Sequence, residues 1–206
     1  MKEKICSLAL AAAVIAFTGV AGWAQQSSSS TRSTRSTEST SSTKSTSDTS
    51  GASASSSEKH FIAEAAQADM AEVELGKLAE KNASDRSVKD FAKKMVDDHS
   101  KNQKKVDDTA SKLGVSVPAS LSAKDQAERD KLSKLSGPEF DKAYMTDMVR
   151  DHKKDVATFK RESTSAKNDV VQTYASETLP TLEDHLKQAE DVNAKVNGSA
   201  SSAAMR

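Results

Sequence analysis

Apolar side chains recur at the spacing of an α-helix from residue 58 to residue 197, and few residues interrupt this pattern. Within this stretch glycine occurs only at positions 76, 114 and 137, and proline only at positions 118, 138 and 180. No segment shows the sustained alternation of apolar and polar residues that is typical of a half-buried strand. We therefore predict one all-α domain over residues 58–197, because about 140 residues suffice for a single hydrophobic core.

The pattern divides into four long helices and one short helix. Ser84 is predicted to cap the second long helix and Gly114 to end it. Ser122 and Asp125 resemble a capping box, which predicts a short helix inside the connection 115–137. A connection of this length favours a four-helix bundle in which the chain crosses over between its second and third long helices. The expected ranges are about 58–81, 84–113, 122–135 for the short helix, 138–164 and 168–196.

The first 24 residues have the three parts of a secretory signal peptide. Lys2 and Lys4 give a basic start, residues 5–20 are uncharged and largely apolar, and small residues at 22 and 24 offer a cleavage site. The apolar run is short for a membrane span, which needs about 20 residues. We expect export to the periplasm or cell envelope, with an uncleaved signal as the one alternative that would contact a membrane.

Low-complexity sequence separates this signal from the predicted domain. Serine and threonine fill 23 of the 31 positions from 27 to 57, and no large apolar residue occurs there. Such a segment cannot bury enough surface to offset its ordering entropy, so residues 25–57 are predicted to be a disordered linker. Residues 198–206 are small and polar, and we expect a frayed tail there.

Cysteine usage and charge exclude several classes of function. Cys6 is the only cysteine and lies in the predicted signal, so the mature chain would have no thiol for disulfides, thiolate metal sites or nucleophilic catalysis. The chain has 30 Lys and Arg against 30 Asp and Glu, and both signs alternate along the helices. Because a nucleic-acid binder needs a concentrated basic face, no nucleic-acid partner is expected.

Four polar residues occupy positions on the apolar faces of the four long helices: Glu72, His99, His152 and His185. The segments that precede His99 and His152 are nearly repeated, since Phe-x3-Met-Val-x-Asp-His in one corresponds to Tyr-x3-Met-Val-x-Asp-His in the other. Buried polar groups need partners, so these side chains are predicted to be hydrogen-bonded or to bind a metal. Asp155, one turn beyond His152, is a candidate partner for that histidine.

Counting residues from the loops tests whether these groups meet. If the connection returns the chain to the end where it started, the four residues lie at similar depths, roughly 14–24 Å from one end. Side chains lean toward the N-terminus of their helix, which brings the four closer together. Without the crossover, His185 lies roughly 12 Å from Glu72 along the bundle. The crossover arrangement therefore predicts one shared site.

Four segments in order resemble an exported bacterial family known as domain of unknown function 4142: residues 71–79 (AEVELGKLA), 95–99 (MVDDH), 137–144 (GPEFDKAY) and 179–186 (LPTLEDHL). The resemblance covers about residues 58–195. It implies a ferritin-like four-helix fold in the cell envelope and no assigned activity. It also implies that the family's glutamate and three histidines correspond to Glu72, His99, His152 and His185.

Two interpretations of these four residues stay open. Three imidazoles and one carboxylate suit a single ion of zinc, iron, copper or manganese. A ferritin-type di-iron centre is disfavoured, because Val96, Val149 and Leu182 stand where its Glu-x-x-His motif would place glutamates. Alternatively, the histidines are hydrogen-bonded in the core and serve a structural or pH-sensing role.

A third hypothesis is a cell-envelope module that binds a protein or cell-wall partner and in which the histidine cluster is only structural or pH-sensing. It depends on the predicted tether alone. An enzyme is disfavoured, because the chain contains no serine or cysteine nucleophile motif and no glycine-rich phosphate loop. The sequence therefore favours a binding or structural role.

Overall fold

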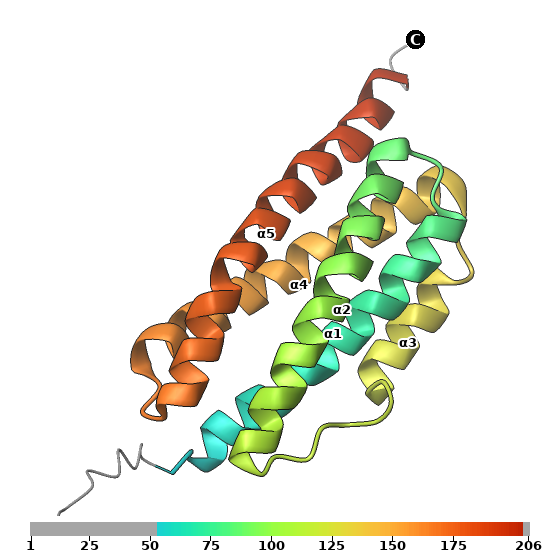
Figure 1. The fold of residues 1–206 in the computed structure, drawn as a ribbon. Helices are drawn as coiled ribbons and strands as arrows, with labels where there is room; N and C mark the ends of the chain where they lie inside the picture. Colours follow the sequence, from blue (N-terminus) through green and yellow to red (C-terminus); the bar gives the residue numbers. More distant parts are fainter. Residues whose placement is uncertain (1–52, 204–206) are drawn as a thin grey trace, which may run out of the picture. The chain divides into compact units, whose positions relative to one another are not determined.

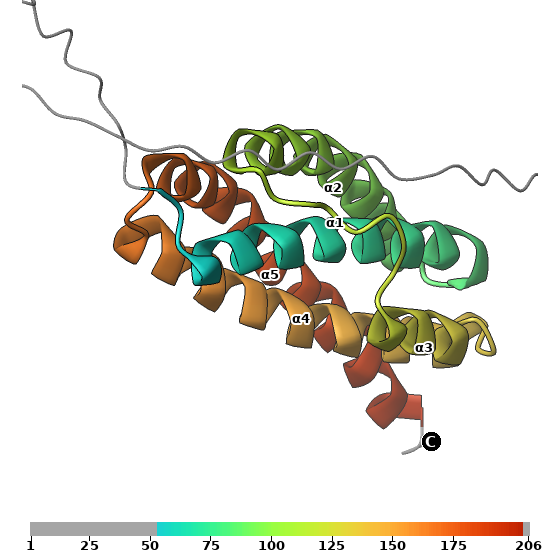
Figure 2. The ribbon, with the colours of Figure 1, turned by 90° about the horizontal axis from the view of Figure 1, so that it is seen from below.

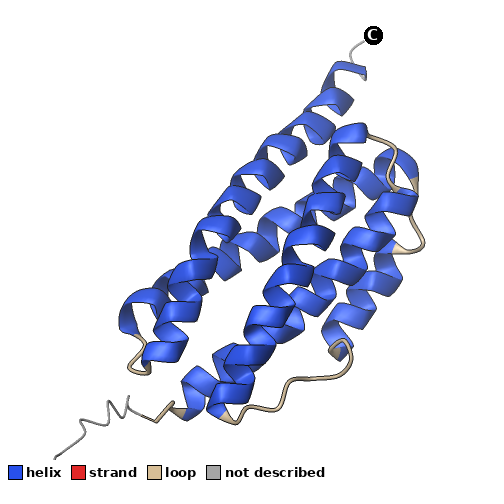
Figure 3. Ribbon diagram, in the orientation of Figure 1, coloured by secondary structure: helices blue, strands red, loops and turns tan. Residues whose placement is uncertain are grey.

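The computed structural model describes residues 53–203, with side chains described through residue 198. Within residues 53–203 the chain forms five α-helices and no β-strand, which confirms the predicted all-helical class (Figure 3). The predicted signal, 1–24, and residues 25–52 of the predicted linker lie outside the described residues. The helices are α1 (Ser56–Asn82), α2 (Arg86–Leu113), α3 (Ala123–Leu132), α4 (Gly137–Ser165) and α5 (Asp169–Ala203).

Helix α1 begins two residues before the predicted start because Ser55 caps it. The hydroxyl of Ser55 accepts a hydrogen bond from the Glu58 backbone N–H, and the Glu58 carboxylate accepts one from the Ser55 backbone N–H. This reciprocal capping box satisfies two backbone donors that a helix start otherwise leaves without partners. Residues 56 and 57, predicted as linker, are therefore the first residues of the helix.

Helix α2 starts after Asp85, and not after Ser84 as predicted. Asp85 is the N-cap, since its carboxylate accepts from the Ser87 backbone N–H. The hydroxyl and backbone N–H of Ser84 both donate to Asp141 in α4, and the Asp85 backbone N–H does the same. Asp141 thereby fixes the α1–α2 connection to the N-terminal part of α4. Gly114 ends α2 as predicted, in the left-handed conformation with φ 62°.

Helix α3 is shorter than predicted, and α5 is longer. Ser122 caps α3 by accepting from the Asp125 backbone N–H, but the helix ends at Leu132 because the following turns tighten into bonds between residues three apart. Helix α5 continues through Ala203, so the predicted boundary at 197 differs from the structure. Gly198 lies within this helix and does not end it, and residues 204–206 are outside the described range.

The four long helices pack as two antiparallel pairs, α1 with α2 and α4 with α5 (Figure 1). The pairs meet through α2 with α5 and through α1 with α4. After α2 the chain returns through residues 114–122 and α3, so that α4 runs in the same direction as α2 (Figures 1 and 2). Helix α3 contacts α1 and α4 and lies beside them. This crossover is the arrangement that places the four predicted polar residues at similar depths.

The hydrophobic core has two parts. One surrounds Phe91, Tyr144 and Met148, and the other surrounds Phe61, Phe159 and Tyr174. Along each long helix the residues of the two parts are separated by a short stretch that contains one of the four predicted polar residues. The fold therefore holds a polar layer between two apolar layers. Within the described residues, no helix combines the length and apolar composition that crossing a membrane requires.

Candidate metal centre

The polar layer receives one side chain from each long helix. Glu72 comes from α1, His99 from α2, His152 from α4 and His185 from α5. All four are buried, with exposed fractions of 4%, 4%, 0% and 1% respectively. The amphipathic spacing that directs their neighbours into the core also directs these side chains inward. The structure thus places all four predicted residues in the interior at one level.

Three of the four converge on a common point. One ring nitrogen each from His99, His152 and His185 lies within 4.8 Å of the other two. The ring centroids are 5.3 Å apart for His99 and His185, 5.5 Å for His152 and His185, and 5.8 Å for His99 and His152. Within the described residues this is the one group of histidine and acidic ligand atoms gathered closely enough to hold an ion.

Each imidazole is held by a hydrogen bond on its outer nitrogen. Nδ1 of His99 lies 2.8 Å from Oδ1 of Asp69, and Nε2 of His185 lies 3.1 Å from Oδ2 of Asp98. A carboxylate accepts hydrogen bonds, so in both pairs the ring N–H is the donor. Asp98 is itself held by Lys94 at 2.8 Å and Lys101 at 3.1 Å.

His152 is held by the main chain and not by the predicted partner Asp155. Its Nδ1 lies 3.0 Å from the carbonyl oxygen of Met148, one helical turn earlier. A carbonyl oxygen can only accept, so Nδ1 carries the hydrogen. Asp155 is partly buried in α4 and, in the described part of the chain, makes no hydrogen bond to His152. The backbone carbonyl lies directly below the ring on the same helix, and it takes the role that the sequence predicts for Asp155.

These outer hydrogen bonds determine where the inner lone pairs lie. With Nδ1–H in His99 and His152 and Nε2–H in His185, the neutral rings have lone pairs at Nε2, Nε2 and Nδ1. These same three nitrogens are buried and have no hydrogen-bond partner in the structure. A buried polar atom without a partner costs about 1–3 kcal/mol. Three converging acceptors are thus arranged for a shared cation.

Glu72 lies in the same layer but is not one of the converging groups. Its Oε1 is 4.0 Å from Nδ1 of His152, which is the nitrogen that donates to Met148 and not the one without a partner. Its Oε2 is buried and has no hydrogen-bond partner. Burial raises the pKa of Glu72 to about 8, and the charge of His99 opposes this rise. The structure therefore brings together the three predicted histidines and places the predicted glutamate beside them.

The pKa shifts separate the histidines. Burial, followed by the charges of the other rings, lowers the pKa of His152 to about 3 and that of His185 to about 4. Burial also acts to lower the pKa of His99, but the hydrogen bond that His99 donates to Asp69 and the charges of Glu72 and Asp69 outweigh it and raise that pKa. Two rings are thus neutral near pH 7. A metal ion would compete with a proton only at His99.

The residues that hold the site were not identified from the sequence. Asp69 receives hydrogen bonds from His99 and from Asn102, and Asn102 also donates to the hydroxyl of Tyr174. Asp69 is 3% exposed and lies one turn before Glu72 on the same face of α1. The sequence did offer a signal for Asp69, because it is a second carboxylate on the face of α1 that also carries Glu72. Asp98 gave no such signal, because it lies at the edge of the buried arc and is partly exposed.

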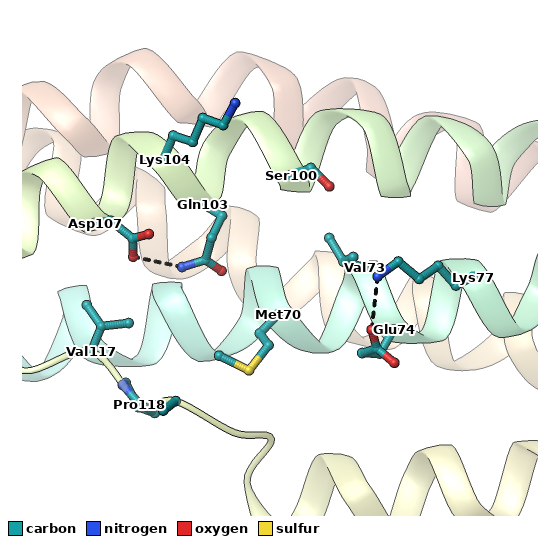
Figure 4. Close-up of a pocket in the computed structure, with 11 residues that line it drawn as sticks. Met70, Val73, Glu74, Lys77, Ser100, Gln103, Lys104, Asp107, Val117 and Pro118 are labelled. Carbon is teal, nitrogen blue, oxygen red and sulfur yellow. Dashed lines mark hydrogen bonds and ion pairs between the residues drawn. The ribbon is translucent and has the colours of Figure 1, made fainter.

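Three cavities reach this layer, and the smallest, of about 60 Å³, is lined in part by Asp69, His99 and Asp155. One of about 150 Å³ lies between α2 and α5 and is lined in part by His99 and His185. Another of about 360 Å³ lies between α1, α3 and α4 and is lined in part by Glu72 and Asp155. A further cavity of about 780 Å³ lies between α1, α2 and residues 117–119, and none of the three histidines lines it (Figure 4). Its lining carries the pairs Lys77–Glu74 and Gln103–Asp107.

Comparison with known proteins gives a family and a similar fold. The family model described as a domain of unknown function (DUF4142) matches residues 43–192, which confirms the resemblance seen in the sequence. A crystal structure of a DUF305 fragment from Deinococcus radiodurans is similar, with a TM-score of 0.61 and 17% identity, and the match covers 69% of this chain and 98% of that one. At this identity the similarity concerns the fold alone. No curated protein matches the chain.

Proposed function

This chain belongs to the DUF4142 family, a domain of unknown function, and we propose that it binds one transition-metal ion through His99, His152 and His185. The single observation that supports this proposal is the convergence of three buried histidines: one ring nitrogen of each lies within 4.8 Å of the other two, and each ring has one buried nitrogen without a hydrogen-bond partner. Their outer nitrogens donate to two carboxylates and a carbonyl, the pattern that orients metal-binding histidines.

The chemistry of the ligands restricts the ion. Imidazole suits zinc, copper and iron, and manganese remains a candidate because Glu72 could add an oxygen ligand. Tetrahedral zinc with bonds of 2.0–2.1 Å needs nitrogens about 3.4 Å apart. The observed nitrogens, within 4.8 Å, require only small movements of the rings. Three protein ligands leave one coordination position, which is typical of sites that exchange a ligand.

We extend the proposal to the molecule and its location. The crossover between α2 and α4 supports a ferritin-like four-helix bundle over residues 58–197. The basic start, apolar run and small residues before position 25 support a cleaved signal and an exported protein. The part of the serine- and threonine-rich segment that precedes the cap of α1, residues 25–54, would then be a tether that separates the bundle from a membrane or wall.

Equilibrium dialysis of the metal-free chain against zinc, copper, iron or manganese, followed by metal analysis, tests the proposal. We expect one ion per chain for at least one metal at micromolar concentration, and loss of that ion in His99→Ala, His152→Ala and His185→Ala. His60→Ala is the matched control for the three clustered histidines, because His60 is exposed on α1 and does not belong to that cluster, although it lines the cavity between α1, α3 and α4. The absence of a bound ion, or an ion that all three variants retain, would refute the proposal.

The same variants test the structural alternative. Three inward nitrogens without partners are a poor means of stabilising a core, because each costs about 1–3 kcal/mol when left unpaired. If metal never binds and His99→Ala lowers the melting temperature strongly, the histidines serve packing. If metal binds to the wild type and the metal-free variants melt near the wild-type temperature, the structural alternative is wrong.

A further inference from the structure

The cavity between α1, α3 and α4 has a strongly acidic lining. Its two lysines, Lys124 and Lys154, stand against six acidic side chains, which gives a formal charge of −4 when all six are ionised. Arg150 lies outside the lining but pairs with Glu128 and Asp151, which reduces the local charge to −3. Burial raises the pKa of Glu72 to about 8, so near pH 7 its proton is lost only when a cation takes its place, and the charge before binding is about −2. The six acidic side chains are those of Glu64, Glu72, Asp125, Glu128, Asp151 and Asp155.

A second observation separates this cavity from an ordinary acidic surface. Glu72, on its inner wall, is only 4% exposed, and its Oε2 has no hydrogen-bond partner. Its other oxygen lies 4.0 Å from Nδ1 of His152. Glu72 thus stands between the cavity and the histidine layer, with one buried oxygen still able to accept a ligand. A buried carboxylate oxygen without a donor is suited to a cation.

The cavity on the opposite side lacks these properties. Between α2 and α5, Asp98 and Glu177 are balanced by Lys101 and Lys105, so the formal charge of that lining is zero. Its volume is also smaller, about 150 Å³ against about 360 Å³. The cavity between α1, α3 and α4 is therefore both larger and more negatively charged than the one between α2 and α5.

We propose that the cavity between α1, α3 and α4 binds a hydrated divalent cation and passes it to the three histidines, with Glu72 and Asp155 as its inner carboxylate ligands. This inference rests on the proposed function, because the histidines are the destination of the ion. Acidic walls raise the local concentration of cations and speed their association. Glu72, which borders both regions, accepts the ion as it loses water.

Stopped-flow absorbance of Co²⁺ binding tests the route, because Co²⁺ in a site with imidazole ligands has visible d–d bands. We expect Glu72→Gln and Asp155→Asn to slow association by about tenfold at low salt while one Co²⁺ still binds per chain. Glu177→Gln, which removes a carboxylate from the neutral cavity, is the matched control and should leave the rate unchanged. Circular dichroism shows whether each variant is folded.

Three outcomes would overturn the inference. Association rates unchanged in both carboxylate variants would mean that the acidic cavity is not the route. A slower rate in Glu177→Gln alone would place the route between α2 and α5. No Co²⁺ bands in the wild type would refute the proposed function and this inference together, whereas normal bands with unchanged rates refute the inference alone.

A second measurement detects the ion in the cavity itself. Mn²⁺ at low concentration should broaden the amide NMR signals of residues 122–128 and 151–155 in the His185→Ala variant, which has lost a histidine on the side away from Glu72. The signals of residues 177–182, which border the neutral cavity, should keep their widths. Uniform broadening, or broadening confined to residues 177–182, would contradict a cation site between α1, α3 and α4.

Discussion

The carboxylate of Glu58 joins two distant parts of the chain. It completes the cap of α1 and also accepts hydrogen bonds from the backbone N–H groups of Lys167 and Asn168, in the connection between α4 and α5. These hydrogen bonds, led by that of Asn168, lower the pKa of Glu58 to about 2. The folded state therefore favours the ionised form.

We predict that Glu58→Gln lowers the free energy of unfolding at pH 7 by about 2 kcal/mol, because hydrogen bonds to a charged group are worth about 1.5–3 kcal/mol. A folded-state pKa of about 2, below the ordinary 4.5, stabilises the fold above pH 4.5, and this contribution is lost as the pH falls toward 2. Urea unfolding at pH 7 and pH 3 measures both effects. Between pH 7 and pH 3 the free energy of unfolding should fall less for Glu58→Gln than for the wild type. The exposed Glu64→Gln variant should behave as the wild type.

Asp69 offers a second prediction at the same scale. Asp69→Asn keeps the size of the side chain but replaces the charged acceptor of the His99 Nδ1–H. Loss of such an outer partner typically weakens metal binding by 10–100-fold, so we expect a dissociation constant higher by that factor. Competition with a chelator of known affinity measures it. Asp97→Asn, on the exposed face of α2, is the control, and equal effects in the two variants would contradict the assigned role.

Residue-level prediction from the sequence succeeded where periodicity alone determines direction. His99, His152 and His185 lie on apolar faces, and the structure buries all three. The hydrogen-bond partner of each ring depends on which residue of a neighbouring helix or turn lies next to its outer nitrogen once the helices have packed. The spacing of residues along one helix does not predict this. The position of Asp155 on the helix predicts it as the partner of His152, but the ring donates to the backbone carbonyl of Met148. A backbone carbonyl is present at every position of a helix, so the sequence does not single it out.

At the scale of elements, Gly76 permits the close packing of α1 on α2. A Cβ at this position would lie 2.7 Å from Cγ2 of Val96 and 3.0 Å from the carbonyl oxygen of Ala92. The Val96 side chain has some freedom to move, but the carbonyl belongs to the α2 backbone. The space between the two helices is thus matched to a glycine, although glycine is an unfavourable helix residue.

We expect Gly76→Ala to lower the free energy of unfolding by about 1–3 kcal/mol, because overpacking outweighs the gain in helix propensity. Thermal or urea unfolding measures the change. Gly198→Ala is the matched control, since an added Cβ there would meet nothing within 4 Å and stability should stay the same or rise slightly. A Gly76→Ala variant as stable as the control would show that the two helices separate easily.

The ends of the helices were less predictable than their existence. Ser84 and Asp85 are both good N-cap residues, and the choice between them depends on Asp141, which lies 57 and 56 residues away in sequence. The boundary of α3 at Leu132 likewise depends on how its last turn packs, because Leu132 is fully buried. Local sequence restricts a boundary to a few residues, and tertiary contacts select among them.

At the scale of the molecule, the crossover decides whether a site exists. The residue count from the sequence allowed two arrangements, and only the one in which α4 runs parallel to α2 brings the three histidines together (Figure 1). Periodicity gave no preference between these arrangements, because both bury the same faces. The length of the connection was the one signal in favour of the crossover, and it proved informative.

Metal binding should therefore stabilise the whole domain. An ion at 100 times its dissociation constant adds about 2.7 kcal/mol to the free energy of unfolding, provided that the unfolded chain does not bind it. For a domain of about 150 residues this raises the melting temperature by about 5–10 °C. Calorimetry with the preferred metal and then with excess chelator measures the shift. His152→Ala should have the same melting temperature with the metal as with excess chelator.

The most direct test of the metal centre is a crystal of the metal-loaded chain with data collected at the absorption edge of the bound ion. We predict one anomalous peak inside the domain, about 2.0–2.2 Å from Nε2 of His99, Nε2 of His152 and Nδ1 of His185. A peak at other residues, or histidine nitrogens that still share no ion at saturating metal, would contradict the account.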